Sequence, residues 1–269
     1  MPRGLALHTW TLDTTPLAEV LAVGRRTGWD AVELRRIDFA RASWAGQSAA
    51  QVLDLVRASG LTVACVGVEA GWMFAEGTER RRLLQAFAES CAWAVELGCR
   101  TVMSPVDRGR GEVVQAAASL CEVGELAARH GVRLALEPNS QAEQFNTLEP
   151  VGEVVRRAAH PHCGLLVDTY HLVRSGGDHR SLRDLAPGEI AYVQYSDVPR
   201  DGLQPGVTTD RLPPGKGIVP FGEIFRLLEE QGYDGHLSYE APNPATWARD
   251  PEEVAREAHR ATRAFLPGG

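Results

Sequence analysis

The sequence lacks the features that define several large classes of protein. It contains no run of about 18 apolar residues, the length that a membrane-spanning helix needs, and its first ten residues carry no basic-then-apolar signal region. Its five cysteines are an odd number without a CxxC pair, which argues against a disulfide framework or a thiolate zinc site and favours a reducing compartment. Acidic residues (35) outnumber basic residues (28), and the formal net charge of −7 gives no overall attraction to nucleic acid. We therefore expect a cytoplasmic protein that binds neither membranes nor nucleic acids.

The sequence does contain a repeated alternation of short apolar runs and longer amphipathic stretches. The apolar runs are nearly continuous, which predicts strands that are covered on both faces. Because helical stretches separate them, these strands should pair in parallel through right-handed crossovers. The predicted strands are Leu5–Thr9, Ala31–Leu34, Leu61–Val68, Thr101–Ser104, Val132–Glu137, Cys163–Asp168, Ile190–Ser196 and His236–Glu240.

The stretches between these runs have the apolar spacing of amphipathic helices, with repeats at three and four residues. Glycines follow the ends of several of them, where a left-handed C-cap favours glycine. These glycines are Gly28, Gly60, Gly98, Gly131 and Gly232. The predicted helices are Pro16–Thr27, Ala49–Ser59, Glu79–Leu97, Glu112–His130, Leu148–Ala159, Phe221–Gln231 and Pro251–Phe265, with only short helical pieces around His179–Leu185.

Eight strand–helix units in 269 residues match the count and length of a (β/α)8 barrel. A doubly wound open sheet is the alternative, but no strand-to-helix turn carries the glycine-rich dinucleotide fingerprint. No linker rich in proline, glycine or serine divides the chain. We therefore predict an α/β protein with one domain over residues 1–269, a single-domain (β/α)8 TIM barrel.

One segment, Asp197–Gly217, has neither a helical nor a strand pattern. It contains four prolines and four glycines and follows the seventh predicted strand. A structureless loop of about twenty residues in a compact domain is usually a lid or a binding loop, and in a barrel this one would lie on the catalytic face. A disordered surface insertion is the alternative. Its basic residues Arg211 and Lys216 are candidates for binding a substrate phosphate.

Oxygen-bearing side chains mark four consecutive predicted strands. Glu137, Asp168 and Glu240 end strands five, six and eight, and Gln194 lies within strand seven. The carboxyl ends of barrel strands meet at one mouth, where three close carboxylates would raise one another's pKa. A divalent cation with oxygen ligands would remove that penalty. A single strand-end acid can also cap a helix or form a salt bridge, but this explanation is weaker for four consecutive strands.

The motifs around these residues resemble those of the xylose isomerase-like barrel superfamily. They are LEP at Glu137, VDTYH at Asp168, VQYSDVPR at Gln194 and SYE at Glu240, in this order along the second half of the chain. The superfamily includes sugar isomerases, ketose 3-epimerases, hydroxypyruvate isomerase, inosose and dehydroshikimate dehydratases, and endonuclease IV. The resemblance implies a barrel that binds one divalent metal ion.

Carried over by this resemblance, the metal ligands are Glu137, Asp168, Gln194 and Glu240. The third ligand of the family is most often histidine, and glutamine at this position resembles the hydroxypyruvate isomerase-like members. An amide oxygen makes the site harder than an imidazole would, which favours Mn²⁺ or Mg²⁺ and leaves Co²⁺ or Zn²⁺ as alternatives.

Further residues are candidates for contact with the substrate. Glu143, His171 and Arg200 match substrate-contacting positions of the epimerase-like members by their spacing from the ligands. His8 ends the first predicted strand and Glu33 lies on the second, so both would face the same mouth, although such residues are also often structural. The candidates for an apolar wall of the pocket, or alternatively for packing between helices, are Trp10, Trp72 and Phe74.

The resemblance implies chemistry through an enediolate that the metal ion stabilises, with Glu137 and Glu240 as the acid–base pair. Return of the proton to the neighbouring carbon gives isomerisation, and return to the opposite face gives epimerisation. Expulsion of a β-hydroxyl group instead gives dehydration. The first step is common to all three reactions, so the motifs do not separate them. We predict an isomerase or epimerase of a small sugar or hydroxy-carbonyl compound.

Three other functions stay open at this point. A metal-dependent dehydratase of the inosose or 3-dehydroshikimate type would use the same site. An apurinic endonuclease is disfavoured, because that branch needs several additional histidines and this chain is acidic. A metal-binding protein without catalysis would predict loss of the acid–base pair, yet Glu137 and Glu240 are both present. Relatives often form dimers or tetramers, so the resemblance also leaves a homo-oligomer open.

Overall fold

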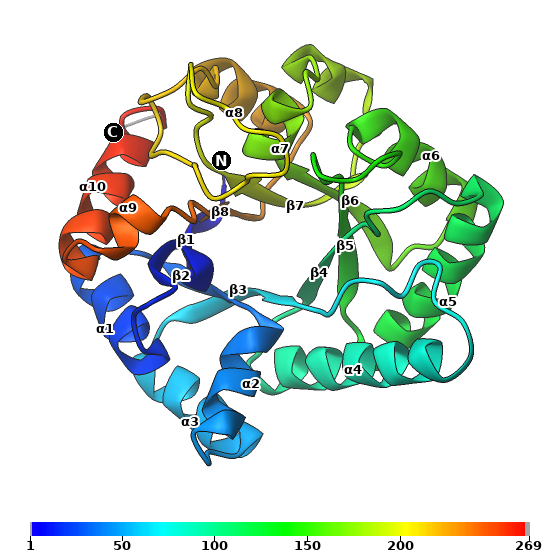
Figure 1. Cartoon of the computed structure of the whole chain (residues 1–269), viewed down its shortest axis with the longest axis horizontal. Coiled ribbons are helices and arrows are strands. Elements are labelled where there is room, and N and C mark those ends of the chain that lie inside the picture. The colour runs from blue at the N-terminus through cyan, green and yellow to red at the C-terminus, as the bar shows by residue number, and fades with distance from the viewer. Residues whose placement is uncertain (1, 267–269) are drawn as a thin grey trace.

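Eight parallel strands, paired in the order β1 to β8, close into a barrel that helices surround in the computed structural model, which describes residues 2–266 (Figure 1). The strands are β1 (Gly4–His8), β2 (Ala31–Leu34), β3 (Thr62–Gly67), β4 (Thr101–Pro105), β5 (Arg133–Glu137), β6 (Cys163–Asp168), β7 (Ile190–Tyr195) and β8 (His236–Tyr239). The predicted single-domain (β/α)8 TIM barrel is therefore confirmed, and each predicted strand is present to within one residue at either end. Within residues 2–266, no helix has the length and apolar character to cross a membrane.

The helices lie outside the strands and connect each strand to the next (Figure 1). They are α1 (Leu17–Thr27), α2 (Arg36–Trp44), α3 (Ala49–Ser59), α4 (Gly77–Glu96), α5 (Val113–His130), α6 (Leu148–Ala158), α7 (Thr169–Arg174), α8 (Phe221–Glu230), α9 (Pro244–Trp247) and α10 (Pro251–Arg263), with 3-10 helices η1 (Thr9–Leu12) and η2 (His179–Asp184). The cap glycines predicted from the sequence all have a positive φ, for example +87° at Gly28, because the chain leaves each helix through a left-handed residue.

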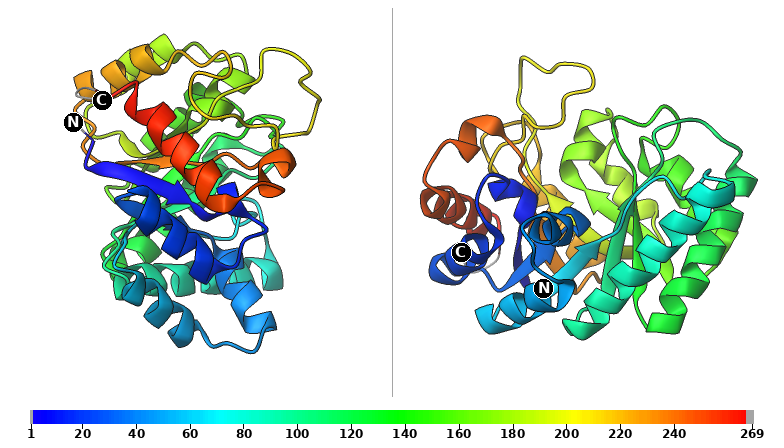
Figure 2. Two further views of the ribbon diagram at one scale, coloured as in Figure 1. Left: turned by 90° about the vertical axis from the view of Figure 1, so that its left-hand side faces the viewer. Right: turned by 60° about the horizontal axis from the view of Figure 1, so that its bottom comes forward.

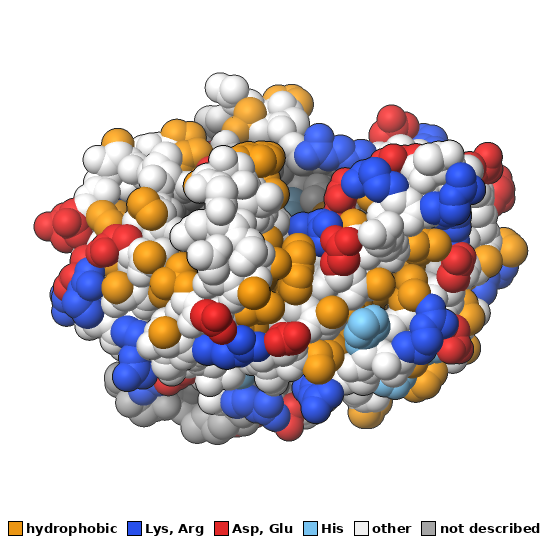
Figure 3. All heavy atoms as spheres, turned by 90° about the horizontal axis from the view of Figure 1, so that it is seen from below, with side chains coloured by type: hydrophobic (Ala, Val, Ile, Leu, Met, Phe, Trp, Pro, Cys, Tyr) orange, Lys and Arg blue, Asp and Glu red, His pale blue; other side chains and the backbone are white. Residues whose placement is uncertain are grey.

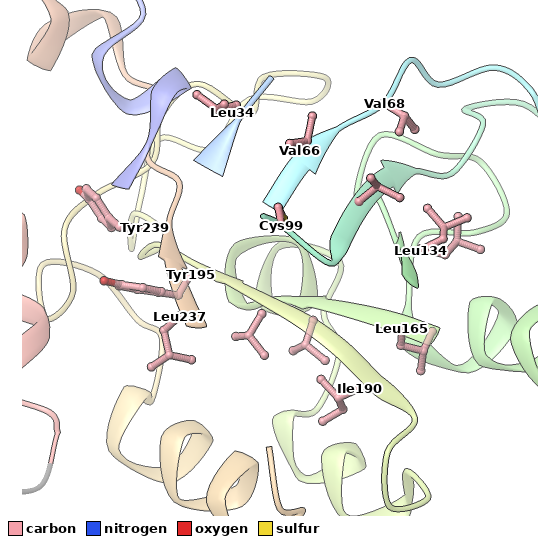
Figure 4. Close-up of a cluster of buried hydrophobic side chains, with 14 of the residues drawn as sticks. Leu34, Val66, Val68, Cys99, Leu134, Leu165, Ile190, Tyr195, Leu237 and Tyr239 are labelled. Carbon is pink, nitrogen blue, oxygen red and sulfur yellow. The ribbon is translucent and has the colours of Figure 1, made fainter. Parts of the chain in front are cut away.

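The strands separate two layers of apolar side chains. Residues such as Leu134, Leu165 and Leu237 point from the strands toward the helices and belong to the main core (Figure 4). The alternate positions face the barrel interior, where small side chains such as Ala6 and Ala135 pack against Tyr192. This alternation places every second strand residue inside the barrel, and at the carboxyl ends of the strands those residues are polar.

Helix α2 is the longest element that the apolar spacing does not predict. It is weakly amphipathic, and of its residues only Asp38 and Phe39 are buried. Its first turn is held instead by the Asp38 carboxylate, which accepts a hydrogen bond of 2.8 Å from the backbone N–H of Arg35. Contacts of this kind, rather than a periodic apolar face, specify the helix.

Ala159 ends α6 in the left-handed region with a φ of +49°, where the other left-handed residues among 2–266 are all glycines. An alanine Cβ is strained in this conformation, whereas glycine adopts it freely. We expect Ala159→Gly to raise the free energy of unfolding by about 0.5–1 kcal/mol, since relief of strain outweighs the added freedom of the unfolded chain. Urea denaturation of the two proteins measures this difference, and a lower midpoint for the variant would contradict the strain at Ala159.

Candidate functional site

Six polar side chains gather at the carboxyl ends of the strands inside the barrel. Each lies at or next to the end of its strand, at a position that faces the interior. All are buried, with at most 6% of the residue surface exposed. They are His8 on β1, Glu33 on β2, Glu137 on β5, Asp168 on β6, Gln194 on β7 and Glu240 directly after β8.

A cavity of about 540 Å³ opens above these residues. His8, Glu137 and Glu240 form part of its floor, and Trp10 and Met103 are among the apolar groups of its wall. A polar floor below partly apolar walls is the usual construction of a small-molecule site at the catalytic face of a barrel.

Within residues 2–266, three of these six side chains have a buried oxygen without a hydrogen-bond partner. They are Glu137 Oε1, Gln194 Oε1 and Glu33 Oε2. A buried acceptor without a donor carries a desolvation cost of about 1–3 kcal/mol, so such an atom calls for a ligand or a bound water. The oxygens of Glu137 and Gln194, together with Asp168 and Glu240, form a set of donors that suits a hard divalent cation. The residues present therefore fit the metal ion that the sequence predicts.

Arg211 has a position that the sequence did not predict, because the sequence analysis considered it only as a loop residue that could bind a substrate phosphate. Its side chain is 1% exposed and lies in the floor, with Nη1 2.7 Å from Asp168 Oδ2 and 2.9 Å from Glu240 Oε2. The guanidinium also lies 4.3 Å from the centre of the Tyr170 ring. Its positive charge balances the carboxylates that converge there. Lys216, the other candidate, is exposed.

The backbone fixes the tautomer of His8. Its Nδ1 accepts a hydrogen bond of 3.0 Å from the Trp10 N–H, and a neutral imidazole that accepts at Nδ1 carries its proton on Nε2. His171 has donors on both sides of its ring, because the Ser140 N–H lies 3.1 Å from Nδ1 and Arg211 Nη2 lies 3.0 Å from Nε2. Burial lowers the pKa of His171 to about 3, and burial beside Arg35 lowers that of His8 well below its usual value, so both rings are neutral. His8 therefore presents an N–H donor to the cavity.

Two ligand sets are compatible with these positions. Glu137, Asp168 and His171 place ligand atoms within 4.8 Å of one another. His171 Nε2 also lies 3.0 Å from Arg211 Nη2, so in the metal-free protein this nitrogen is in contact with the guanidinium. The oxygens of Glu137, Asp168, Gln194 and Glu240 stay the predicted set.

Burial and mutual repulsion control the charge of the acidic groups. Burial, together with the nearby charges of Glu240 and Asp168, raises the pKa of Glu137 well above its usual value. Burial also raises the pKa of Glu240 to about 7 and that of Glu33 to about 8, although Arg211 opposes the shift of Glu240. These carboxyl groups hold protons more tightly in the folded protein than in the unfolded chain.

The free energy of unfolding of the metal-free protein should therefore fall as the pH rises above about 6.5, the ordinary pKa of histidine. The unfolded chain releases the protons of Glu33 and Glu240 near pH 4.5, whereas the folded protein releases them near 8 and 7. We expect the free energy of unfolding to decrease by on the order of 2 kcal/mol between about pH 6.5 and pH 8. Urea denaturation with a chelator across this range measures the decrease, and a flat or rising profile would contradict the raised pKa values.

The segment Asp197–Gly217 is an ordered loop that projects beyond the barrel (Figure 2). Asp197 pairs in antiparallel fashion with Leu212, and its carboxylate accepts hydrogen bonds from the N–H groups of Gly217 and Val219. Tyr170 Oη donates to Asp210 on the descending limb. These contacts close the base of the loop and carry Arg211 back into the floor of the cavity.

Two predicted substrate contacts are not brought to the cavity. Glu143 is exposed and pairs with Arg110 at 3.2 Å on the surface. Arg200 is exposed on the outgoing limb of the loop and does not line the cavity. Arg211, eleven residues later, is the arginine that reaches the floor, because the loop turns back between the two positions.

The three aromatic candidates have different positions. Trp10 lines the cavity. Trp72 is buried and donates through its indole N–H to Ser104 Oγ at 2.9 Å, and Phe74 stacks on Phe145 with a distance of 6.1 Å between ring centres. Trp72 and Phe74 therefore have the packing role that the sequence left as the alternative.

On the face of the molecule drawn in Figure 3, basic and acidic side chains are interspersed and form no large patch of one charge. Many of them form exposed ion pairs, such as Arg82 with Glu69 and Glu79. Pairs of this kind contribute little to stability, typically about 0–1 kcal/mol each. The unusual electrostatics of the molecule are those of the cavity floor.

Comparison with known proteins gives a consistent assignment of the fold. Residues 21–265 match the family model described as "Xylose isomerase-like TIM barrel". The structure is similar to the crystal structure of the IolI protein with a binding zinc atom, with a TM-score of 0.87 and 20% identity, covering 97% of both chains. At this identity the likeness concerns the fold.

Two curated relatives show similarity in sequence as well. An inosose isomerase of Bacillus velezensis is 24% identical over 265 residues, which is 95% of this chain and 94% of that protein. A 3-dehydroshikimate dehydratase of Pseudomonas aeruginosa is 33% identical over 136 residues, which is 49% of this chain. That match spans 21% of the length of the dehydratase.

Proposed function

The chain belongs to the xylose isomerase-like TIM barrel family, and from this premise we propose that it is a divalent-metal-dependent isomerase or epimerase of a small sugar or hydroxy-carbonyl compound. The observation that carries the proposal is the pair of buried, unpartnered oxygens, Glu137 Oε1 and Gln194 Oε1, at the same carboxyl end of the barrel as the Asp168 and Glu240 carboxylates. In this proposal these four residues hold the ion. When bound, it supplies a Lewis acid for a carbonyl and its neighbouring hydroxyl.

The residues of the floor have complementary roles in this proposal. One carboxylate of the Glu137 and Glu240 pair takes a proton from the carbon next to the carbonyl, and the electron pair of the C–H bond moves toward the carbonyl oxygen. The other returns a proton to the neighbouring carbon or to the opposite face. The Nε2–H group of His8 is a fixed donor for a substrate oxygen, and it remains a donor throughout because the ring does not titrate near neutral pH. His171 lines the same cavity, beside Arg211.

A dehydratase is the second candidate. The match of 33% to a 3-dehydroshikimate dehydratase supports it, although the match covers half of this chain. Dehydration begins with the same proton removal and differs in the next step, in which a β-hydroxyl leaves. The same residues would serve both reactions, so the product distinguishes them.

Proton exchange followed by NMR tests the proposal. The metal-stripped protein, reloaded with Mg²⁺, is incubated in deuterated water with ketoses, hydroxypyruvate, inosose and 3-dehydroshikimate. We expect deuterium next to a carbonyl only when the metal is present, and the product then separates isomerase, epimerase and dehydratase. Exchange at the same rate with a chelator present would contradict the proposal.

A further inference from the structure

Glu33 lies in the barrel interior but is not one of the proposed metal ligands. It sits on β2, has no exposed surface, and reaches across the barrel to a residue 161 positions away, Gln194 on β7. Glu33 Oε1 accepts a hydrogen bond of 2.8 Å from Gln194 Nε2. Its second oxygen, Oε2, is buried without a partner.

The orientation of the Gln194 amide decides what that side chain can do. One end of an amide is an oxygen with two lone pairs, and the other is an NH₂ group that only donates. The NH₂ group donates its hydrogen bond to Glu33, so the amide oxygen points the other way. Within residues 2–266 this oxygen has no hydrogen-bond partner. A rotation of the amide by half a turn would instead present two N–H donors to a cation, which is repulsive.

Glu33 has few partners in the interior. His8 Nε2 lies 3.6 Å from Glu33 Oε1, beyond normal hydrogen-bond distance, and its ring is neutral. The hydroxyls of Tyr192 and Ser238 lie near the carboxyl group and help to lower its pKa, against the larger rise that burial causes. The contact with Gln194 is the one within normal hydrogen-bond distance.

We propose that Glu33 is a positioning residue that makes Gln194 an oxygen ligand: it binds the amide nitrogen and thereby aims Oε1 at the metal ion. The inference rests on the proposed function, because it assumes that Gln194 is a ligand. Groups that hold a ligand in this way typically change metal affinity by about 10- to 100-fold when they are removed.

The test measures Mn²⁺ binding to the full chain by isothermal titration calorimetry, with the protein stripped of metal beforehand. In Glu33→Gln, the new amide can still accept from Gln194 but can equally donate to its oxygen, so the orientation is no longer fixed. In Glu33→Leu, no acceptor remains. We expect the dissociation constant to rise about 10-fold or more in Glu33→Gln and further in Glu33→Leu. Ser196→Ala is the matched control, since Ser196 directly follows β7 two residues after Gln194, is buried, and has an Oγ without a hydrogen-bond partner within residues 2–266.

A second readout separates positioning from a merely structural role. The metal-free Glu33→Gln protein should melt at the same temperature as the wild type or higher, because a neutral amide of the same size still accepts from Gln194 and a buried ionisable group has left the interior. Loss of affinity without loss of metal-free stability supports the inference. Wild-type affinity in both Glu33 variants overturns it, and so does a loss of affinity that only parallels lower stability. Absence of Mn²⁺ binding in the wild type would overturn the proposed metal site itself.

Discussion

Replacing Glu240 by glutamine is expected to reduce deuterium incorporation into the substrate by at least about 10³-fold, the upper part of the range for loss of a general acid or base. Glutamine keeps the size of the side chain and an oxygen that can accept a hydrogen bond, but it cannot take up or release a proton. The same NMR exchange assay measures the loss.

The control for this experiment is Glu149→Gln, which makes the same chemical change on an exposed position of α6. The exchange rate of this variant should equal that of the wild type. Both variants are also titrated with Mn²⁺, so that loss of the metal ion is distinguished from loss of the proton acceptor. A Glu240→Gln protein that binds Mn²⁺ and retains more than a tenth of the exchange rate would remove Glu240 from the acid–base pair.

Arg211→Met is expected to lower the free energy of unfolding of the metal-free protein by about 3–5 kcal/mol, the range for loss of one partner from a buried ion pair. Without Arg211, the carboxylates of Asp168 and Glu240 lose the cation that lies 2.7 Å and 2.9 Å from them. Methionine fills part of the space but supplies no charge. Urea denaturation in the presence of a chelator measures the loss.

Added Mn²⁺ should restore more stability to Arg211→Met than it adds to the wild type, because the ion replaces the missing positive charge. Arg256→Met is the matched control, since Arg256 is exposed and pairs with Glu252 on the surface of α10. That change should cost less than about 1 kcal/mol. A loss in Arg211→Met no larger than in Arg256→Met would mean that the carboxylates of the floor are uncharged in the metal-free protein.

Much of the architecture was predictable because its causes are local. The spacing of apolar residues specifies strands such as Ala31–Leu34 and helices such as Ala49–Ser59, and the structure has both with the same bounds. Helix α2 was not predicted, because side-chain capping by Asp38 rather than an apolar face holds its first turn. The polar strand ends were predictable as a group, since the closure of a barrel brings all carboxyl ends of its strands to one mouth.

The barrel and the oxygen-bearing residues Glu137, Asp168, Gln194 and Glu240 at its mouth could be predicted from the sequence, because both follow from a repeating pattern and its register. The contacts that hold this set depend instead on the tertiary structure. Arg211 enters the floor because a loop folds back, and Glu33 contacts Gln194 because the barrel closes between strands 161 residues apart in sequence. Contacts of this kind leave no pattern in the sequence around either residue, because they form only when the fold brings two distant segments together and removes water from between them.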